Sequence, residues 1–244
     1  MEAAQCDFQA AAKIVRDWEG GPPFEWSGPV FKIEEGPRSI GAPDLSHLRV
    51  PTNPEIASIA ASRRLMPEAV ALAAERGLLW CGHFWHQHVW AIADRTGQSA
   101  ILRRIDGCKW SRGQKALMAP GSRGDRFIGV SESTSFPRII IIEGGPDLLA
   151  AFQFILTTPL FDYRDDFTVI CAISTQSNFG LDAWRFRDKY VQIIAHNDEP
   201  GLKAAQKWRK QLQEVRALLT CTSVPSAGDL NDHLLEPTSS LIKC

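Results

Sequence analysis

The sequence contains no long apolar run and no excess of charge of either sign. No stretch approaches the roughly 20 consecutive apolar residues that a membrane-spanning helix needs, and the amino terminus lacks the pattern of a secretory signal peptide. We therefore expect a cytoplasmic protein that makes no membrane contact. The 27 lysines and arginines balance 28 aspartates and glutamates, so the chain as a whole does not bind nucleic acid through net positive charge alone.

Paired cysteines are missing as well. The six cysteines are scattered along the chain and form no C-x-x-C pair, so we expect reduced, mostly buried thiols in a reducing compartment. No internal repeat is visible. With 44% hydrophobic and 23% charged residues, the 244-residue chain has the composition of a globular protein with one large domain or two small ones.

Composition divides the chain into three segments. Residues 1–52 are rich in glycine and proline, which predicts an extended leader, and an apolar stretch at residues 8–18 has the length of a helix. Residues 53–136 begin with two helical patterns and continue with short strands and polar turns, which predicts a small α+β subdomain with an antiparallel sheet. Residues 137–244 alternate strands with helices, which predicts an α/β domain around a mainly parallel sheet.

Apolar runs and helical periodicity locate the elements of this last segment. Strands are expected at residues 139–142, 167–173, 191–195 and 219–224, and helices at residues 146–156, 181–187, 201–218 and 230–235.

The most informative stretch is I-I-I-I-E-G-G-P-D, which begins at Ile139 and ends at Asp147. Four β-branched residues in a row are typical of a strand that is buried on both faces of a parallel sheet. The two glycines permit a tight turn, and Pro146 suits the first turn of a following helix. Glu143 is therefore expected at the carboxyl end of a central strand, where α/β sheets bind ligands. Its charge needs a partner there, and a divalent cation is the expected one.

Two further acidic clusters follow predicted strands in the same way. They are H-N-D-E at residues 196–199 and G-D-L-N-D at residues 228–232. Because the carboxyl ends of parallel strands meet at one edge, we expect the three clusters to share a site. Several carboxylates suit Mg²⁺, which also accepts phosphate oxygens as ligands. The chemistry implied is the transfer or cleavage of a phosphodiester.

The three clusters, in this order, resemble the TOPRIM domain of the bacterial-type DNA primases of phages and plasmids. The motifs E-G-G-P-D, H-N-D-E-P-G-L-K-A-A and G-D-L-N-D carry the resemblance, which covers residues 137–235 and extends more weakly over residues 90–122. The resemblance implies a TOPRIM fold preceded by a small basic α+β subdomain. It also implies a nucleotidyltransferase that makes RNA primers on single-stranded DNA from nucleoside triphosphates.

The resemblance implies roles for individual residues. Glu143 matches the family's general acid/base, and Asp147 and Asp198 match the other catalytic aspartates. The implied ligands of Mg²⁺ or Mn²⁺ are Glu143, Asp198, Asp229 and Asp232.

Basic residues concentrate between residues 95 and 126, where eight lysines and arginines occur with only two aspartates. Positive groups on loops suit a phosphate backbone or a triphosphate, although a solvated sheet face would show the same pattern. In the primases that this segment resembles, basic residues hold the template and the incoming nucleotide. The candidate nucleic-acid and nucleotide-binding residues are Arg103, Arg104, Lys109, Arg112, Lys115, Arg123 and Arg126.

The sequence departs from the family pattern at His196, which stands where the first Asp of a D-x-D motif is expected. A neutral imidazole adds no charge and is a poorer Mg²⁺ ligand than a carboxylate. No zinc ribbon and no helicase motor motif accompany the domain, so any helicase partner would be a separate chain. Two other functions stay open: a TOPRIM-type metal-dependent nuclease, and a catalytically weakened nucleic-acid-binding module of a mobile element.

A second group of potential metal ligands consists of Cys81, His83, His86 and His88. Their spacing does not match common zinc sites, and along one continuous strand His86 and His88 would lie on the face opposite to His83. A half-exposed strand is the favoured explanation.

Overall fold

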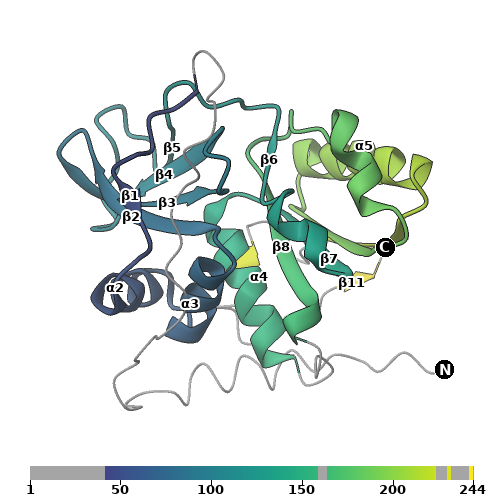
Figure 1. Ribbon diagram of the computed structural model, residues 1–244, viewed down its shortest axis with the longest axis horizontal. Helices are drawn as coiled ribbons and strands as arrows, with labels where there is room; N and C mark the ends of the chain where they lie inside the picture. The colour runs from purple at the N-terminus through teal and green to yellow at the C-terminus, as the bar shows by residue number, and fades with distance from the viewer. Residues whose placement is uncertain (1–41, 159–163, 224–229, 232–241, 244) are drawn as a thin grey trace.

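The computed structural model describes residues 42–158, 164–223, 230–231 and 242–243, and it contains two β-sheets with helices packed against them (Figure 1). Within these residues, no helix combines the length and the apolar character needed to cross a membrane. The helix expected at residues 8–18 lies outside the described residues, as does most of the one expected at residues 230–235.

The first sheet is antiparallel, with the strand order β1-β2-β3-β4-β5. Helices α2 (Asn53–Arg63) and α3 (Pro67–Glu75) contribute to a hydrophobic core with one face of this sheet. Its first strand falls within the segment that was expected to be an extended leader. The strands are β1 (Leu48–Arg49), β2 (Leu79–Phe84), β3 (Gln87–Ala93), β4 (Ala100–Arg104) and β5 (Leu117–Met118).

The segment around the clustered histidines is a hairpin rather than the single strand expected from the sequence. Trp85 and His86 turn the chain with positive φ angles of 47° and 62°. His83 therefore pairs with His88 across the hairpin, and their rings stack with centroids 5.0 Å apart. Side chains alternate between the two faces only along one continuous strand, and here the turn separates two strands. His83 and His88 therefore lie on the same face of the sheet, and their expected placement on opposite faces is wrong.

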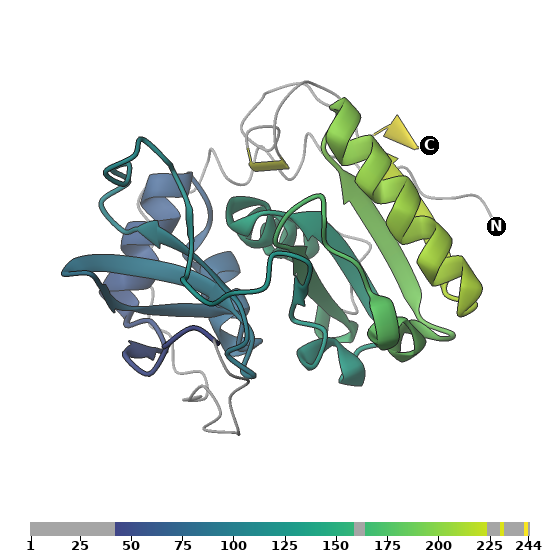
Figure 2. The same cartoon turned by 90° about the horizontal axis from the view of Figure 1, so that it is seen from above.

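The second sheet has the strand order β11-β10-β9-β7-β8-β6, and its four central strands run parallel. Helix α4 (Gly145–Thr157) packs on one face and α5 (Glu199–Glu214) on the other (Figure 2). This arrangement confirms the predicted α/β fold with a mainly parallel sheet. The strands are β6 (Phe127–Ile128), β7 (Arg138–Glu143), β8 (Phe167–Ala172), β9 (Tyr190–Ala195), β10 (Leu218–Ser223) and β11 (Ile242–Lys243).

Three short 3₁₀ helices complete the described part of the chain. They are η1 (Glu132–Ser135), η2 (Arg164–Asp166) and η3 (Gly180–Phe186). The last of them occupies the place of the short helix expected at residues 181–187.

The four isoleucines of β7 are each at most 1% exposed and divide between the two faces of the sheet. Ile140 and Ile142 belong to a core formed with α3 and α4, whereas Ile139 and Ile141 belong to a core formed with α5. Burying each of these side chains contributes roughly 1.5–3 kcal/mol relative to leaving it exposed. The strand is thereby fixed from both sides, and with it the position of Glu143.

The core that contains Ile140 and Ile142 continues into the first sheet. It includes Leu148 of α4, Val70 of α3 and Trp90 of β3. Helix α4 therefore packs against both the second sheet and α3, near the middle of the molecule (Figure 1). The carboxyl end of β7, where α4 begins, lies next to the first sheet.

Candidate active site

Glu143 is the last residue of β7, and the turn after it lies against the first sheet. Gly144 has a φ of 87°, a conformation that residues with a side chain rarely adopt. At Gly145, a Cβ atom would lie 3.0 Å from Cγ1 of Ile92 and 3.3 Å from Cζ3 of Trp90. The two glycines thus let the strand turn into α4 within a space that the first sheet restricts.

Asp147 lies in the first turn of α4, is 2% exposed and has both carboxylate oxygens engaged within the protein. Its Oδ2 lies 2.6 Å from Nε2 of His196, which follows β9. Its Oδ1 accepts a hydrogen bond of 3.1 Å from the main-chain N–H of Asn231. The Asn231 side chain in turn donates to the carbonyl oxygen of Arg63, at 3.1 Å. Asp147 therefore joins three segments that are far apart in the sequence.

The surroundings of Glu143 raise its pKa. Burial is the main cause, because it disfavours the charged carboxylate. The neighbouring charges of Asp198 and Asp147 raise the pKa further, while His196 lowers it. The structure thus brings the three predicted catalytic residues within electrostatic reach of one another, at the sheet edge where the sequence predicted them.

Asp198 is the N-cap of α5. Its Oδ1 accepts a hydrogen bond of 2.7 Å from the main-chain N–H of Gly201. A Cβ atom on Gly201 would lie 2.8 Å from the carbonyl oxygen of His196, so only glycine fits there without a shift of the main chain. This cap fixes the exposed Asp198 carboxylate beside the loop that carries His196.

The described side chains fit a hard divalent cation in part. The carboxylates of Glu143 and Asp198 are of the type that Mg²⁺ prefers, and a cation would relieve the crowding of negative charge that raises the pKa of Glu143. Among the residues that the structure describes, however, no three His, Cys, Asp or Glu side chains are grouped so as to hold a metal ion. The other two predicted ligands, Asp229 and Asp232, lie outside the described residues.

Two arginines lie beside the turn that follows Glu143. The guanidinium carbons of Arg63 and Arg103 are 5.6 Å and 6.0 Å from the ring centroid of Trp90. Cζ3 of this ring would lie 3.3 Å from a Cβ atom at Gly145. Burial raises the pKa of the Cys171 thiol on β8, and the positive charge of Arg103 opposes this rise. The charge of Arg103 therefore reaches β8, next to the strand that carries Glu143. Arg63 was not predicted, because nothing in the sequence distinguishes it from other arginines at the end of a helix.

The other six predicted basic residues divide into two groups. Lys109, Arg112 and Lys115 are exposed in the loop between β4 and β5. The other three form ion pairs: Arg104 with Asp106, Arg123 with Asp125 at 2.9 Å, and Arg126 with Asp182 at 3.3 Å.

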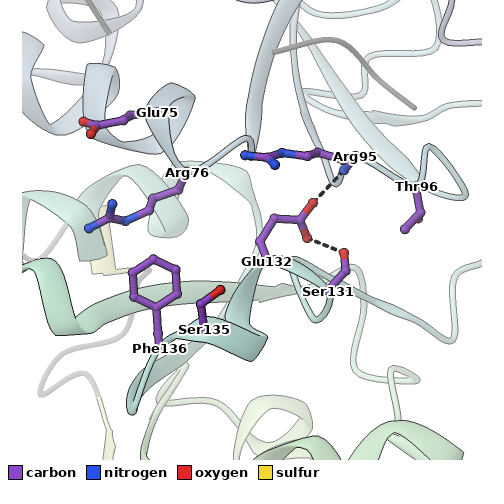
Figure 3. A pocket seen from close by; sticks show the side chains of 8 residues that line it. All are labelled: Glu75, Arg76, Arg95, Thr96, Ser131, Glu132, Ser135 and Phe136. Carbon is purple, nitrogen blue, oxygen red and sulfur yellow. Dashed lines mark hydrogen bonds between the residues drawn. The ribbon is translucent and has the colours of Figure 1, made fainter. Parts of the chain in front are cut away.

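Two pockets lie elsewhere in the molecule. One, of about 350 Å³, has Arg76, Arg95 and Glu132 in its lining, and Glu132 accepts hydrogen bonds from Arg95 N and Ser131 Oγ (Figure 3). It lies beside η1, before the amino end of β7, whereas Glu143 is at the carboxyl end. Another, of about 270 Å³, is lined in part by the paired Arg126 and by residues of η3. Neither includes a predicted catalytic carboxylate.

No family model matches the sequence, and no curated protein matches it. Among solved structures, the chain is similar to the primase fragment of the bacteriophage T7 primase-helicase protein, with 15% identity and a TM-score of 0.44 over 70% of this chain and 66% of that one. It is also similar to the DnaG primase catalytic domain bound to single-stranded DNA, with 15% identity and a TM-score of 0.47 over 75% of this chain and 69% of that one. A third similar structure is the RNA polymerase domain of Mycobacterium tuberculosis primase DnaG, with 14% identity and a TM-score of 0.47 over 74% and 71%.

The chain thus spans just under two thirds of the T7 primase fragment and slightly more of the two DnaG domains. The three are a primase fragment, a primase catalytic domain and a primase RNA polymerase domain.

Proposed function

We propose that this protein is a primase-like nucleotidyltransferase that makes RNA primers on single-stranded DNA. The observation that supports this best is the gathering of Glu143, Asp147 and Asp198 at one sheet edge. Carboxylates that hold a metal ion, with a guanidinium such as Arg103 beside them, suit the stabilisation of charge during phosphoryl transfer. Primer synthesis is favoured over hydrolysis because the segment upstream of the carboxylates also resembles a primase.

In this proposal, Glu143 and Asp198 bind Mg²⁺ or Mn²⁺ together with Asp229 and Asp232. When bound, the ion stabilises negative charge on the oxygens of the transferred phosphate. A carboxylate oxygen of Glu143 accepts the proton of the attacking hydroxyl group.

Asp147 has a positioning role in this proposal rather than a metal-binding one. Both of its oxygens already accept hydrogen bonds within the protein, and the residue is buried. It holds His196, and with it the loop that carries Asp198, beside Glu143. The replacement of a family aspartate by His196 thus exchanges a repulsion between two carboxylates for a hydrogen bond.

Arg103 and Arg63 bind the triphosphate of the incoming nucleotide. The Trp90 ring beside them restrains both guanidinium groups, and a planar guanidinium can form two parallel hydrogen bonds to a phosphate. The template in this proposal is single-stranded DNA.

Primer synthesis on single-stranded DNA with nucleoside triphosphates, measured with Mg²⁺ and separately with Mn²⁺, tests the proposal. We expect Glu143→Gln to reduce the rate by about 10²- to 10⁴-fold, the usual contribution of a general base. Glu214→Gln is the matched control, because this exposed glutamate at the end of α5 lies outside the site. If no product formed with Mg²⁺ and none formed with Mn²⁺, primase activity would be refuted.

A catalytically weakened binding module is the second candidate. It is favoured by His196, which stands where the family pattern has an aspartate. Calorimetry with Mn²⁺ separates the two functions: binding that is lost in Asp198→Asn supports the enzyme, and no binding supports the module. Nicking of supercoiled plasmid in the absence of nucleotides would instead indicate a nuclease.

A further inference from the structure

Trp85 is one of the most exposed large apolar side chains in the described part of the chain, with 62% of its surface accessible. It lies in the turn between β2 and β3, where Trp85 and His86 both have positive φ angles. Type I′ hairpin turns normally use Asn and Gly at such positions, because bulky residues are strained there. Exposure and backbone strain at a bulky residue are both unfavourable for stability, which points to a role in binding.

The indole of Trp85 is held by two aromatic neighbours. Its ring centroid is 4.8 Å from that of Phe84, at an interplanar angle of 46°. The ring of Trp110 meets it edge-on at 6.4 Å. Phe84 and Trp110 are at most 9% exposed and belong to the core on the outer face of the first sheet. Trp85 is thus an exposed ring on a rigid base.

Basic residues lie close to Trp110 in the sequence. Lys109 precedes it directly, Arg112 and Lys115 follow it by two and five positions in the same loop between β4 and β5, and all three are exposed. Within the described residues none of the three forms an ion pair, unlike the other predicted basic residues Arg104, Arg123 and Arg126. Their charge is therefore available to a polyanion.

Other exposed aromatic rings in the described part of the chain already have a cationic neighbour. The guanidinium carbon of Arg185 is 5.1 Å from the ring centroid of Trp184, and that of Arg138 is 5.1 Å from Tyr190. No such cation lies over Trp85 among the described residues. An exposed ring next to unneutralised positive charge matches the way in which proteins bind single strands, with bases on aromatic rings and phosphates on basic side chains.

We propose that Trp85 stacks on an unpaired base and that Lys109, Arg112 and Lys115 bind the adjoining phosphates, so that the β2–β3 hairpin forms a second contact for single-stranded nucleic acid. The hairpin lies roughly 13 Å from Trp90 along β3, from the rise of about 3.3 Å per residue. It is thus separate from the carboxylates at the end of β7. The inference deepens the proposed function by naming where the template strand is held, but binding there requires no catalysis.

The test is fluorescence anisotropy with a labelled oligothymidine of about 16 nucleotides, a length that a single binding domain can cover. It is carried out without metal or nucleoside triphosphate, so its result does not depend on primer synthesis. We expect Trp85→Ala to weaken binding about 5- to 150-fold, from the usual contribution of one stacked base. Trp85→Phe should retain most of the affinity. Tyr190→Ala removes a similarly exposed ring on the second sheet and should leave affinity unchanged.

A second measurement tests the charges. Replacing Lys109, Arg112 and Lys115 together by Gln should reduce the slope of log K against log salt by about 2, because each phosphate contact on a single strand contributes about 0.7. Unchanged affinity in Trp85→Ala would overturn the proposal. An equal loss for duplex DNA would also overturn it, because paired bases cannot stack on the ring. If Trp85→Ala changed the oligomeric state but not the affinity for the oligonucleotide, the proposal would be overturned, and the surface would instead bind a second copy of the chain.

Discussion

Single residues in this protein depend on partners that are distant in the sequence. Asp147 and His196 are 49 positions apart, and they meet because β7 and β9 are parallel neighbours whose carboxyl ends lie together. The sequence predicted both strand ends, and it predicted that Glu143, Asp147 and Asp198 would gather at one edge. It did not predict that a histidine would bind Asp147, because the motif pattern only marks His196 as a missing aspartate.

Glu55 shows the same dependence in the first sheet. This carboxylate in the first turn of α2 is 5% exposed. Burial opposes its charge, but hydrogen bonds from Arg49, Thr52 and His88 outweigh burial and lower its pKa to about 2, from the usual 4.5. Because the pKa is lower in the folded state, ionised Glu55 stabilises the fold above pH 4.5, and this stabilisation is lost as the pH falls toward 2.

We therefore expect Glu55→Gln to lower the free energy of unfolding at pH 7 by on the order of 3 kcal/mol, the equivalent of the pKa shift. The difference from the native protein should shrink steadily between about pH 4.5 and pH 2. Urea denaturation over this pH range measures it, with Glu214→Gln as the control at an exposed position. A difference that stays constant with pH would contradict the assigned pKa.

Among the helices and strands, the sequence predicted those that have a regular pattern of apolar residues. The strands β7, β8, β9 and β10 and the helices α4 and α5 occur close to where apolar runs and helical periodicity located them. The β2–β3 hairpin was missed because its turn uses Trp85 and His86, which carry no turn signal. The short helix expected at residues 181–187 is present as the 3₁₀ helix η3.

The junction between β7 and α4 gives a prediction at this scale. In Gly145→Ala the new methyl group would lie 3.0 Å from Ile92 and 3.3 Å from Trp90, both buried in the first sheet. We expect a loss of stability of about 1–3 kcal/mol, the usual cost of overpacking. Gly124→Ala is the control, because the nearest atom there is 3.5 Å away on the flexible side chain of Met118. Urea denaturation that shows equal stability for both variants would contradict this packing.

For the whole molecule, the central finding is that one hydrophobic core connects the two sheets through α3 and α4. Sequence patterns locate the elements of each sheet, but they contain no signal for how one sheet packs on the other. The approach of Trp90 to Gly145 and of Arg63 to Asn231 therefore could not be predicted. The pairing of Arg126 could not be predicted for the same reason, since its acidic partner, Asp182, is 56 positions away in the sequence.

A shared core predicts cooperative unfolding. Trp80 and Trp90 report on the first sheet, and Trp208 packs against the second, so fluorescence and far-ultraviolet circular dichroism sample both. We expect the two signals to follow one urea transition with the same midpoint. Leu148→Ala, which empties part of the shared core, should lower that midpoint for both signals together, with a loss of about 2–5 kcal/mol. Separate midpoints would show that the sheets unfold independently.

The hydrogen bond between Asn231 and Asp147 has a consequence for how this protein can diverge. The donor to Asp147 is a main-chain N–H, which every amino acid except proline supplies. The hydrogen bond to Asp147 therefore excludes proline at position 231 but requires no particular side chain there. The asparagine side chain is constrained separately, by the Arg63 carbonyl. We expect relatives of this protein to vary at position 231 wherever the main-chain carbonyl at position 63 is out of reach of that side chain. We expect none of them to have proline at position 231.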